Sequence, residues 1–181
     1  MVGEGLRDGE LVRRVRLGDR RAFEVLVNRY GPGLYRFGRR MMGDDTVTED
    51  CVQETFISAW TSMEAFRQEA SLKTWLFGIM ANKVRRELRR QLQRESISME
   101  GVEVAARERT DARAEFTGLL QALDLALSRL PAEQRACWIL REVEGLSYEE
   151  IAHVQRTTTD SVRGRLARAR QSLGRDLEGW R

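Results

Sequence analysis

The chain has 181 residues, of which 41% are hydrophobic and 33% are charged, and its formal net charge is only +3. This length predicts one domain or two small ones, and the apolar fraction excludes a wholly disordered chain. Apolar runs such as 75–77 and 79–81 are far shorter than the ~20 residues that a membrane-spanning helix needs. The first 17 residues mix charged with apolar side chains, unlike a signal peptide. We therefore expect a cytoplasmic protein with no membrane insertion.

Few side chains are available for metal binding or nucleophilic catalysis. The only cysteines, Cys51 and Cys137, form no CxxC pair, and His153 is the single histidine. Neither a zinc site nor a Ser/His/Asp triad can be assembled from this set. We expect two buried thiols and a surface histidine, with no metal, no cofactor and no catalytic residue, and therefore a protein that is not an enzyme.

Apolar residues recur with helical spacing through nearly the whole chain. No stretch long enough for a β-strand alternates apolar with polar residues. In the first half, the expected elements are helices over 20–30, 34–42, 48–63 and 72–93, with a polar loop over 66–70. Asp19 and Ser71 are the candidate N-caps of the first and last of these helices. The Gly-Pro-Gly at 31–33 predicts a break between the first two.

The apolar period disappears over 95–110, which we interpret as a flexible linker. Beyond it we expect a helix that ends near Leu130, a helix with Pro131 in its first turn, and helices over 148–155 and 160–177. Ser147 and Glu150 have the spacing of a capping box at the start of the third of these helices. The sequence thus predicts an all-α fold of two small domains, 1–94 and 111–181, joined by the linker.

The small net charge conceals blocks of one sign. Acids dominate between 44 and 69, whereas arginine and lysine dominate 83–94 and 156–175. Charges interact over about 8 Å at physiological salt, so these blocks matter more than their sum. Because the chain has only two lysines, the basic residues are almost all arginine. Arginine suits phosphate and guanine contacts, although genome base composition explains such a bias equally well.

The acidic block contains a compact polar cluster. Asp50, Gln53 and Glu54 stand at i, i+3 and i+4, and we place them roughly opposite the apolar stripe with Phe56 and Trp60. One interpretation is a docking face for a basic protein surface. A solubilising surface without a partner is the other, and the residues alone do not separate the two.

The helix over 72–93 combines aromatic and basic residues. Arg85/Arg89 and Arg86/Arg90 are i, i+4 pairs of like charge, which repel each other unless a polyanion lies nearby. Asn82 precedes Arg86 by one turn and is a candidate for reading a base edge. Together with Trp75 and the preceding loop, this surface predicts a platform for unpaired bases. A core role for Trp75 is the alternative.

The last helix separates into two faces at ~100° per residue. Its apolar face consists of Val162, Leu166, Ala169 and Leu173. The opposite face presents Gly164, Ala167 and Arg168 with Arg163 at its edge, and small residues there allow close approach to a DNA major groove. The short helix, turn and long basic helix predict a helix-turn-helix, with a plain helical hairpin as the alternative.

Several motifs together resemble the bacterial RNA polymerase sigma factors, specifically the two-domain extracytoplasmic-function (ECF) group of the sigma-70 superfamily. They read GDRRAF at 18–23, DCVQETF at 50–56, TWLFGIMAN at 74–82, LP at 130–131, GLSYEEIA at 145–152 and VRGRLARAR at 162–170. The resemblance covers nearly the whole chain, with the motifs in the order and spacing of the family.

The resemblance implies a promoter-specificity factor that directs initiation, with core RNA polymerase, promoter DNA and an anti-sigma factor as partners. The first domain would bind the β′ clamp helices through Asp50, Gln53 and Glu54 and would open the −10 element. The second would read the −35 element and meet the β flap. The residues implied at −10 are Lys73, Trp75, Asn82, Arg85, Arg86 and Arg89. Those implied at −35 are Arg141, Arg163, Gly164, Ala167 and Arg168.

The chain departs from the family in the turn of the helix-turn-helix, which reads RTTTDS at 156–161 and lacks glycine. Another residue must then adopt unfavourable dihedral angles there, or the turn must change shape. Two rival functions remain: a dimeric operator-binding regulator, which leaves the acidic cluster unused, and a helical adaptor with no DNA role, which leaves the paired arginines unexplained.

Overall fold

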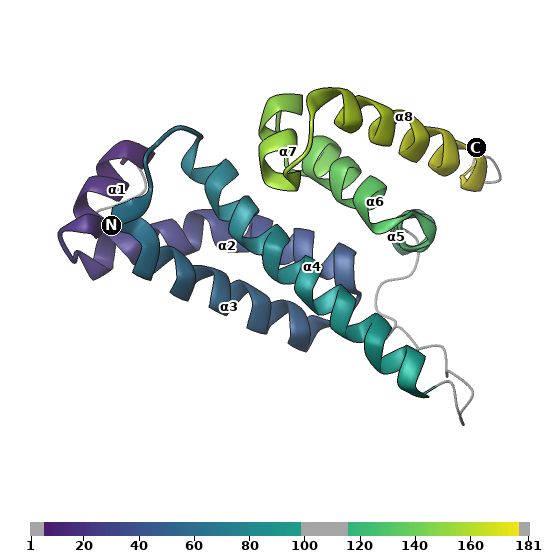
Figure 1. The fold of residues 1–181 in the computed structure, drawn as a ribbon, viewed down its shortest axis with the longest axis horizontal. Helices are drawn as coiled ribbons and strands as arrows, with labels where there is room; N and C mark the ends of the chain where they lie inside the picture. Colours follow the sequence, from purple (N-terminus) through teal and green to yellow (C-terminus); the bar gives the residue numbers. More distant parts are fainter. Residues whose placement is uncertain (1–5, 99–115, 178–181) are drawn as a thin grey trace.

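The computed structural model describes residues 6–98 and 116–177, which form two helical modules (Figure 1). The first module, 6–98, contains α1 (Asp8–Arg16), α2 (Arg20–Met42), α3 (Asp45–Ser62), the 3-10 turn η1 (Met63–Ala65) and α4 (Leu72–Ser98). The second module, 116–177, contains α5 (Phe116–Arg129), α6 (Ala132–Trp138), the π-turn η2 (Ile139–Val143), α7 (Tyr148–Gln155) and α8 (Thr159–Asp176). The described residues include no strand, which confirms the all-α fold class.

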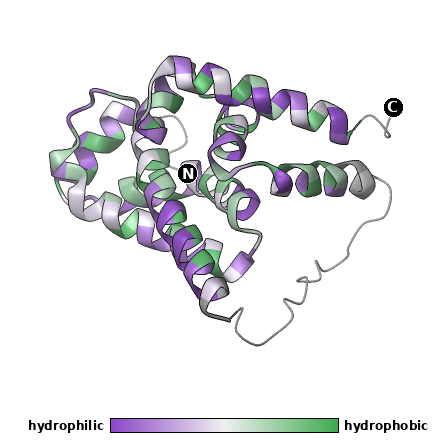
Figure 2. Cartoon of the chain, turned by 45° about the vertical axis from the view of Figure 1, so that its right-hand side comes forward, coloured by the Kyte–Doolittle hydropathy of each residue, from purple (hydrophilic) through white to green (hydrophobic). Residues whose placement is uncertain are grey.

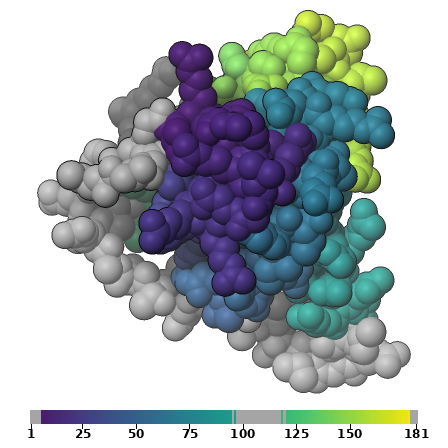
Figure 3. Space-filling model, turned by 90° about the vertical axis from the view of Figure 1, so that its left-hand side faces the viewer, coloured from purple at the N-terminus to yellow at the C-terminus, as the bar shows by residue number. Residues whose placement is uncertain are grey.

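Helix α1 is an addition to the expected elements. Its apolar residues Leu11, Val12 and Val15 are buried although arginines surround them in the sequence. Asp8 at its start accepts hydrogen bonds from the Tyr30 hydroxyl (2.5 Å) and from the Arg29 guanidinium (2.7 Å) of α2. Figure 3 shows α1 on the outside of the first module, with the second module above it.

Helix α2 is continuous through Gly-Pro-Gly, so the predicted break at 31–33 is wrong. Pro32 inside a helix removes a hydrogen bond at a cost of roughly 3 kcal/mol. Burial of Leu26, Leu34 and Phe37 on the same helix outweighs that cost. Local propensity therefore yields to tertiary packing here. Asp19 caps the helix as predicted, because its carboxylate accepts from the backbone of the second and third residues after it.

Two buried threonines of α3, one in its first turn and one near its middle, lie on a face that the apolar stripe does not identify. Thr48 and Thr55 are fully buried, next to Cys51 and Ala59. Each hydroxyl is satisfied locally, because it donates to the backbone carbonyl four residues earlier, at 2.6 and 2.7 Å. The face that α3 turns toward the core is therefore rotated from the predicted stripe, and this rotation leaves Trp60 at the surface.

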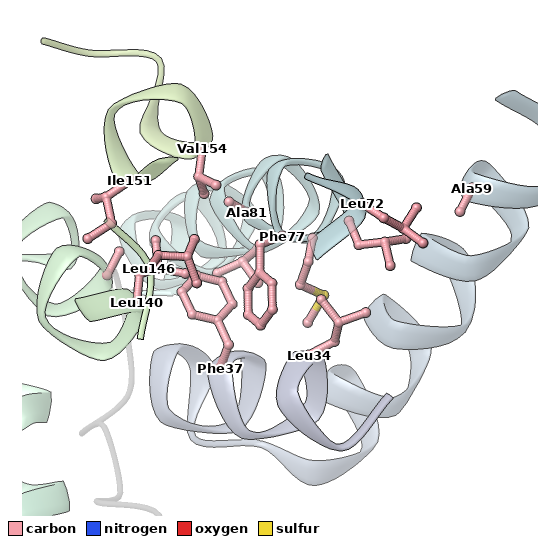
Figure 4. Packing of buried hydrophobic residues seen from close by; sticks show 14 of the residues in the cluster. Leu34, Phe37, Ala59, Leu72, Phe77, Ala81, Leu140, Leu146, Ile151 and Val154 are labelled. Atoms are coloured by element: carbon pink, nitrogen blue, oxygen red, sulfur yellow. The ribbon is translucent and has the colours of Figure 1, made fainter. Parts of the chain in front are cut away.

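One hydrophobic cluster runs through both modules (Figure 4). Phe37 of α2 and Phe77 of α4 meet edge to face, with ring centroids 5.9 Å apart. Second-module side chains, among them Leu140 and Leu146, belong to the same buried cluster. A second, smaller cluster lies within the second module and consists of Ala126, Leu127, Leu130, Ala169 and Leu173. The modules are therefore packed together and share a core.

Helix α4 continues to Ser98, and residues 99–110 of the expected linker lie outside the described residues. Helix α7 has the predicted bounds, and its capping box between Ser147 and Glu150 is confirmed. The following turn places Arg156 in the left-handed region, with φ at 51° and ψ at 52°. A residue at unfavourable dihedral angles is the outcome expected for a turn that lacks glycine.

Candidate nucleic-acid and protein interfaces

An apolar groove lies between α2 and α3 of the first module, and we call it the α2–α3 groove. Its hollow measures about 550 Å³. It is lined by Phe23, Val27, Gly31, Tyr35, Glu49, Val52, Gln53, Phe56, Ile57 and Trp60. Ile57 is 58% exposed and Trp60 is 37% exposed, and both line the same groove, so that they form a contiguous apolar patch of the kind that marks interaction surfaces.

The acidic cluster borders this groove. Asp50, Gln53 and Glu54 are all exposed. Gln53 lines the groove beside Ile57, so its predicted position opposite the apolar stripe is wrong. Glu54 forms an ion pair with Lys83 of α4 at 3.2 Å. The cluster and the apolar residues therefore form one continuous surface of mixed chemistry.

The apolar half of this surface is not among the predicted binding sites. Residues 53, 56, 57 and 60 follow the i, i+3, i+4, i+7 pattern of one helix face, while the buried threonines belong to another. Two adjacent apolar stripes on a helix imply two neighbours. The sequence predicts only one apolar stripe with Phe56 and Trp60, and the structure divides these residues between the core and the groove.

The loop before α4 forms a second hollow with α1. Phe66 is buried and stacks on Trp75, with ring centroids 4.7 Å apart and an interplanar angle of 28°. Beside this pair lies a hollow of about 430 Å³, whose walls mix polar and apolar groups. It is lined by Asp8, Gly9, Val12, Phe66, Gln68, Glu69, Ala70, Ser71 and Leu72. The half-buried Trp75 thus supports the loop, since its ring packs on a loop residue.

The candidate −10 residues of α4 fall into two groups. Arg86 and Arg89 are exposed, and Arg89 also borders a hollow that it shares with Arg85 and with Glu133 of α6. Lys73 and Arg85 instead reach the second module, because each donates to one of its backbone carbonyls: Lys73 to Glu144, and Arg85 to Val154 at 3.2 Å. Asn82 is half-buried, and its side-chain oxygen accepts from Arg85 at 2.8 Å.

Arg85 lies among other cations. Burial lowers the pKa of its guanidinium, and the positive charges of Arg156 and Arg89 lower it further. The first of these neighbours belongs to the turn between α7 and α8. Basic groups from both modules therefore meet at this place, where a nucleic-acid phosphate would relieve their repulsion.

Helix α8 presents the face that its periodicity predicts. Val162, Leu166, Ala169 and Leu173 are buried. Arg163, Ala167 and Arg168 are exposed on the other side, and Arg163 pairs with Asp160 at 2.6 Å. A Cβ at Gly164 would lie 3.5 Å from the Arg168 guanidinium, an ordinary van der Waals distance, so the Arg168 side chain lies next to the backbone at Gly164. Figure 2 shows this alternation of hydrophilic and hydrophobic residues along α8, which leads to the C-terminus.

Tyr148 organises the basic residues beside α8 and was not identified from the sequence. The guanidinium carbon of Arg141 lies 5.1 Å from the centroid of its ring, and that of Arg163 lies 6.0 Å from it. Arg141 also donates to the backbone carbonyl of Leu146 at 2.8 Å. The ring therefore holds two of the candidate −35 arginines at the start of the helix-turn-helix.

Residues 6–98 and 116–177 were also compared with the requirements of metal sites, membrane-spanning helices and reactive cysteines. Within these residues, no group of His, Cys, Asp and Glu is arranged to hold a metal ion. None of the helices there combines the length and apolar character needed to cross a bilayer. Both cysteines are buried and free, and burial raises the pKa of each thiol.

Comparisons with known proteins match both modules. The family models for sigma-70 region 2 and sigma-70 region 4 match residues 26–94 and 120–173. The ECF RNA polymerase sigma-E factor of Haemophilus influenzae is 34% identical over 187 aligned positions, which cover 98% of each chain.

Two solved structures are also similar over most of the chain. The sigma factor RpoE of Bartonella quintana, in complex with the anti-sigma factor NepR, has a TM-score of 0.74 and 29% identity over 86% of this chain and 96% of that one. CnrH in complex with the cytosolic domain of CnrY has a TM-score of 0.73 and 29% identity over 95% of this chain and 97% of that one. The chain belongs to the extracytoplasmic-function group of the sigma-70 family.

Proposed function

We propose that the α2–α3 groove and its acidic border are the surface through which this sigma factor binds core RNA polymerase. The observation that carries the proposal is the exposure of Ile57 and Trp60 beside Asp50, Gln53 and Glu54. A helical partner would bury the apolar residues, and its basic side chains would pair with the acids. In this family the β′ clamp helices are the expected occupant.

The promoter-facing surfaces belong to α4 with its preceding loop and to α8. Arg86 and Arg89 would follow the phosphates near −10, and Trp75 would support the loop that meets unpaired bases. Arg163, Gly164, Ala167 and Arg168 would enter the major groove at −35, while Arg141, held against Tyr148, would meet a phosphate. The separation of an acidic, apolar face from two basic faces suits a factor that binds a protein and DNA at once.

Control by an anti-sigma protein is part of the proposal. RpoE of Bartonella quintana and CnrH are described in complexes with NepR and with the cytosolic domain of CnrY, respectively. We propose a comparable partner for this chain, and activity in the cytoplasm, where RNA polymerase acts. The polymerase would perform the chemistry, because a sigma factor is an initiation factor without a catalytic centre of its own.

A dimeric operator-binding regulator is not favoured. Such a protein needs a helix-turn-helix and a dimer contact, whereas a sigma-70 region 2 model matches the first module here. A helical adaptor with no DNA role is not favoured either, because the sigma-70 region 2 and region 4 models match the two modules.

Trp60→Ala combined with Ile57→Glu tests the groove. We expect at least a tenfold weaker affinity for purified core polymerase, because the double variant removes a large apolar contact and introduces a charge. The readouts are co-migration with core and run-off transcription from a cognate promoter. Leu17→Glu is the matched control, since Leu17 is 79% exposed in the same module but does not line the groove. Equal loss in both variants, or none in the first, would contradict the assignment.

A further inference from the structure

One side chain of α1, Arg16, binds the backbone at the start of the loop over 66–70. We propose that Arg16 is a positioning residue for −10 recognition, which holds this loop against α1 in the conformation that meets unpaired bases. Arg16 does so without contacting DNA itself. The inference deepens the proposed function, since it rests on the assignment of the loop to the −10 element.

The guanidinium of Arg16 bonds to two backbone carbonyls of another segment. Its Nε donates to the Met63 carbonyl at 3.2 Å, and its Nη2 donates to the Phe66 carbonyl. Arg16 is the last residue of α1, so these bonds connect the end of that helix to the beginning of the loop. The bonded residues are themselves fixed in place, because the side chains of Met63 and Phe66 are buried.

The two carbonyls lie where the 3-10 turn η1 ends. Phe66 has φ at −69° and ψ at 105°, an extended conformation, and its N–H donates to the Met63 carbonyl at 3.3 Å. Carbonyls at the C-terminal end of a helical segment lack donors within it, and a cation there is favourable. A guanidinium can bind two of them at once because its N–H donors are spread over a rigid plane, whereas a lysine ammonium is a point charge.

The far end of the loop is fixed as well. The Ser71 hydroxyl accepts from the backbone N–H of Thr74 at 3.0 Å, which confirms Ser71 as the N-cap of α4. Between the two ends, Arg67, Gln68 and Glu69 are exposed. Gln68 has a φ of 58°, in the left-handed region that residues other than glycine rarely occupy. Such a conformation persists only where the surrounding structure enforces it, so the loop needs both of its attachments.

Helix α1 is a firm support for the loop because it is itself held on α2. A helix of nine residues is marginal in isolation, but Leu11, Val12 and Val15 bury its apolar face. The chain just before α1 is also attached, since Arg29 of α2 donates to the Leu6 carbonyl at 2.8 Å. Arg16 therefore joins the loop to an element that other contacts have already ordered.

The hollow of about 430 Å³ beside the loop has walls from both elements. It is lined by Asp8 and Val12 of α1 and by Gln68 and Glu69 of the loop. Helix α1 and η1 are in direct contact (Figure 1). The width of the hollow thus depends on the distance between α1 and the loop, which the two bonds of Arg16 restrain. A loop ordered before it meets DNA loses less conformational entropy on binding, and a displaced one discriminates less well.

A purely structural role is the alternative, in which Arg16 stabilises the fold without affecting how the loop meets bases. The two roles differ in one ratio. A smaller fraction of folded protein lowers initiation at every promoter alike, so the preference for one −10 sequence over another stays the same. A displaced loop changes that preference itself.

Arg16→Ala removes both bonds, and Arg13→Ala is the matched control. The Arg13 guanidinium is exposed on the same helix and bonds to Glu10 of α1 itself. Run-off transcription by the full-length variants with core polymerase compares a cognate promoter with derivatives that carry single-base substitutions in the −10 element. We expect the preference for the cognate −10 element to fall at least threefold in Arg16→Ala and to stay unchanged in Arg13→Ala. In the free proteins, hydrogen exchange of the backbone amides over 64–71 should be at least threefold faster in Arg16→Ala alone.

Arg16→Lys is the second variant, which keeps the charge and remains informative if Arg16→Ala folds poorly. Because a lysine binds one carbonyl at a time, its −10 preference should lie between those of the wild type and Arg16→Ala. Unchanged exchange in both Arg16 variants would overturn the attachment of the loop. Faster exchange with an unchanged −10 preference, or an equal loss of preference in Arg13→Ala, would overturn the positioning role. A wild-type protein without any −10 preference would instead count against the proposed function, while the exchange measurement on the free protein still tests the bonds of Arg16.

Discussion

Helices α4 and α8 both carry runs of arginine, but the fold exposes them differently. The outer face of α8 is open along its length, and Arg163, Ala167 and Arg168 stand on it. Helix α4 is packed against α7 on one side, so that Lys73 and Arg85 are bound by the second module while Arg86 and Arg89 remain exposed. Similar charge patterns thus lie on an accessible helix in one module and on a partly covered helix in the other.

The difference shows that the charge of a helix determines which ligands it can attract, while its tertiary contacts determine which of its side chains are accessible to them. A basic face that is always open favours nonspecific DNA, because phosphate contacts carry no sequence information. A face that a neighbouring module covers exposes fewer cations for such contacts.

The largest expected effect concerns the shared core. Leu146→Ala removes a side chain of the second module that is 1% exposed and belongs to the cluster common to both modules. We expect a loss of about 2–5 kcal/mol in the free energy of unfolding. Hydrogen exchange should show reduced amide protection in α2 and α4 as well as in α6 to α8, because the modules share this core.

Leu173→Ala is the matched control for Leu146→Ala. Leu173 is also buried, but it belongs to the smaller cluster within the second module. Its truncation should lower protection in α5, α6 and α8 while α2 and α4 keep theirs. If Leu146→Ala affects only the second module, the two modules unfold independently and the comparison between covered and open helices loses its basis.

A smaller effect distinguishes the two basic helices directly. Arg168→Ala removes an exposed cation from the face of α8 that we propose enters the DNA major groove, so we expect about tenfold weaker −35-dependent initiation, or ~1.4 kcal/mol, with unchanged core association. Arg85→Ala removes a cation that already donates to the Val154 carbonyl, so the affinity of the protein for DNA should change by less than about threefold. Run-off transcription and fluorescence anisotropy measure the two effects. Equal losses in both variants would show that α4 is as open as α8.

Local sequence signals predict the second module well. The capping box at Ser147, the bounds of α7 and the buried face of α8 all follow from spacing and residue type, because neighbours in the chain determine them. The strain at Arg156 follows in the same way from a turn without glycine. These features need no knowledge of distant contacts.

The first module depends more on distant contacts, and prediction fails there in corresponding places. Pro32 lies inside a continuous helix because buried neighbours such as Leu34 outweigh its local cost. Gln53 lines an apolar groove whose other wall comes from α2. Glu144 is an ordinary acid in the sequence, and only the pairing with Arg36, 108 residues earlier, gives it a role. Periodicity along one helix carries no information on which helix covers it.

The smallest expected effect is a pH dependence at the junction of α4 and α7. Burial raises the pKa of Glu150, but hydrogen bonds from the Ser147 backbone and from the Thr74 and Ser71 hydroxyls outweigh it, and the pKa lies below its usual value of 4.5. Because the folded pKa is depressed, ionised Glu150 stabilises the protein above pH 4.5, and this stabilisation is lost as the pH falls through the folded pKa.

Urea denaturation between about pH 6 and pH 3 measures this contribution, which we expect to be below about 1 kcal/mol for a partly solvated group. Glu150→Gln keeps a capping acceptor but cannot ionise, so its stability should fall less steeply with acid than that of the wild type. Thr74→Val removes one of the donors that lower the pKa, and its acid dependence should lie between the two. If Thr74→Val follows the wild-type curve, the bond across the modules contributes nothing to the ionisation of Glu150, and the covered state of α4 then rests on Glu144 and apolar packing alone.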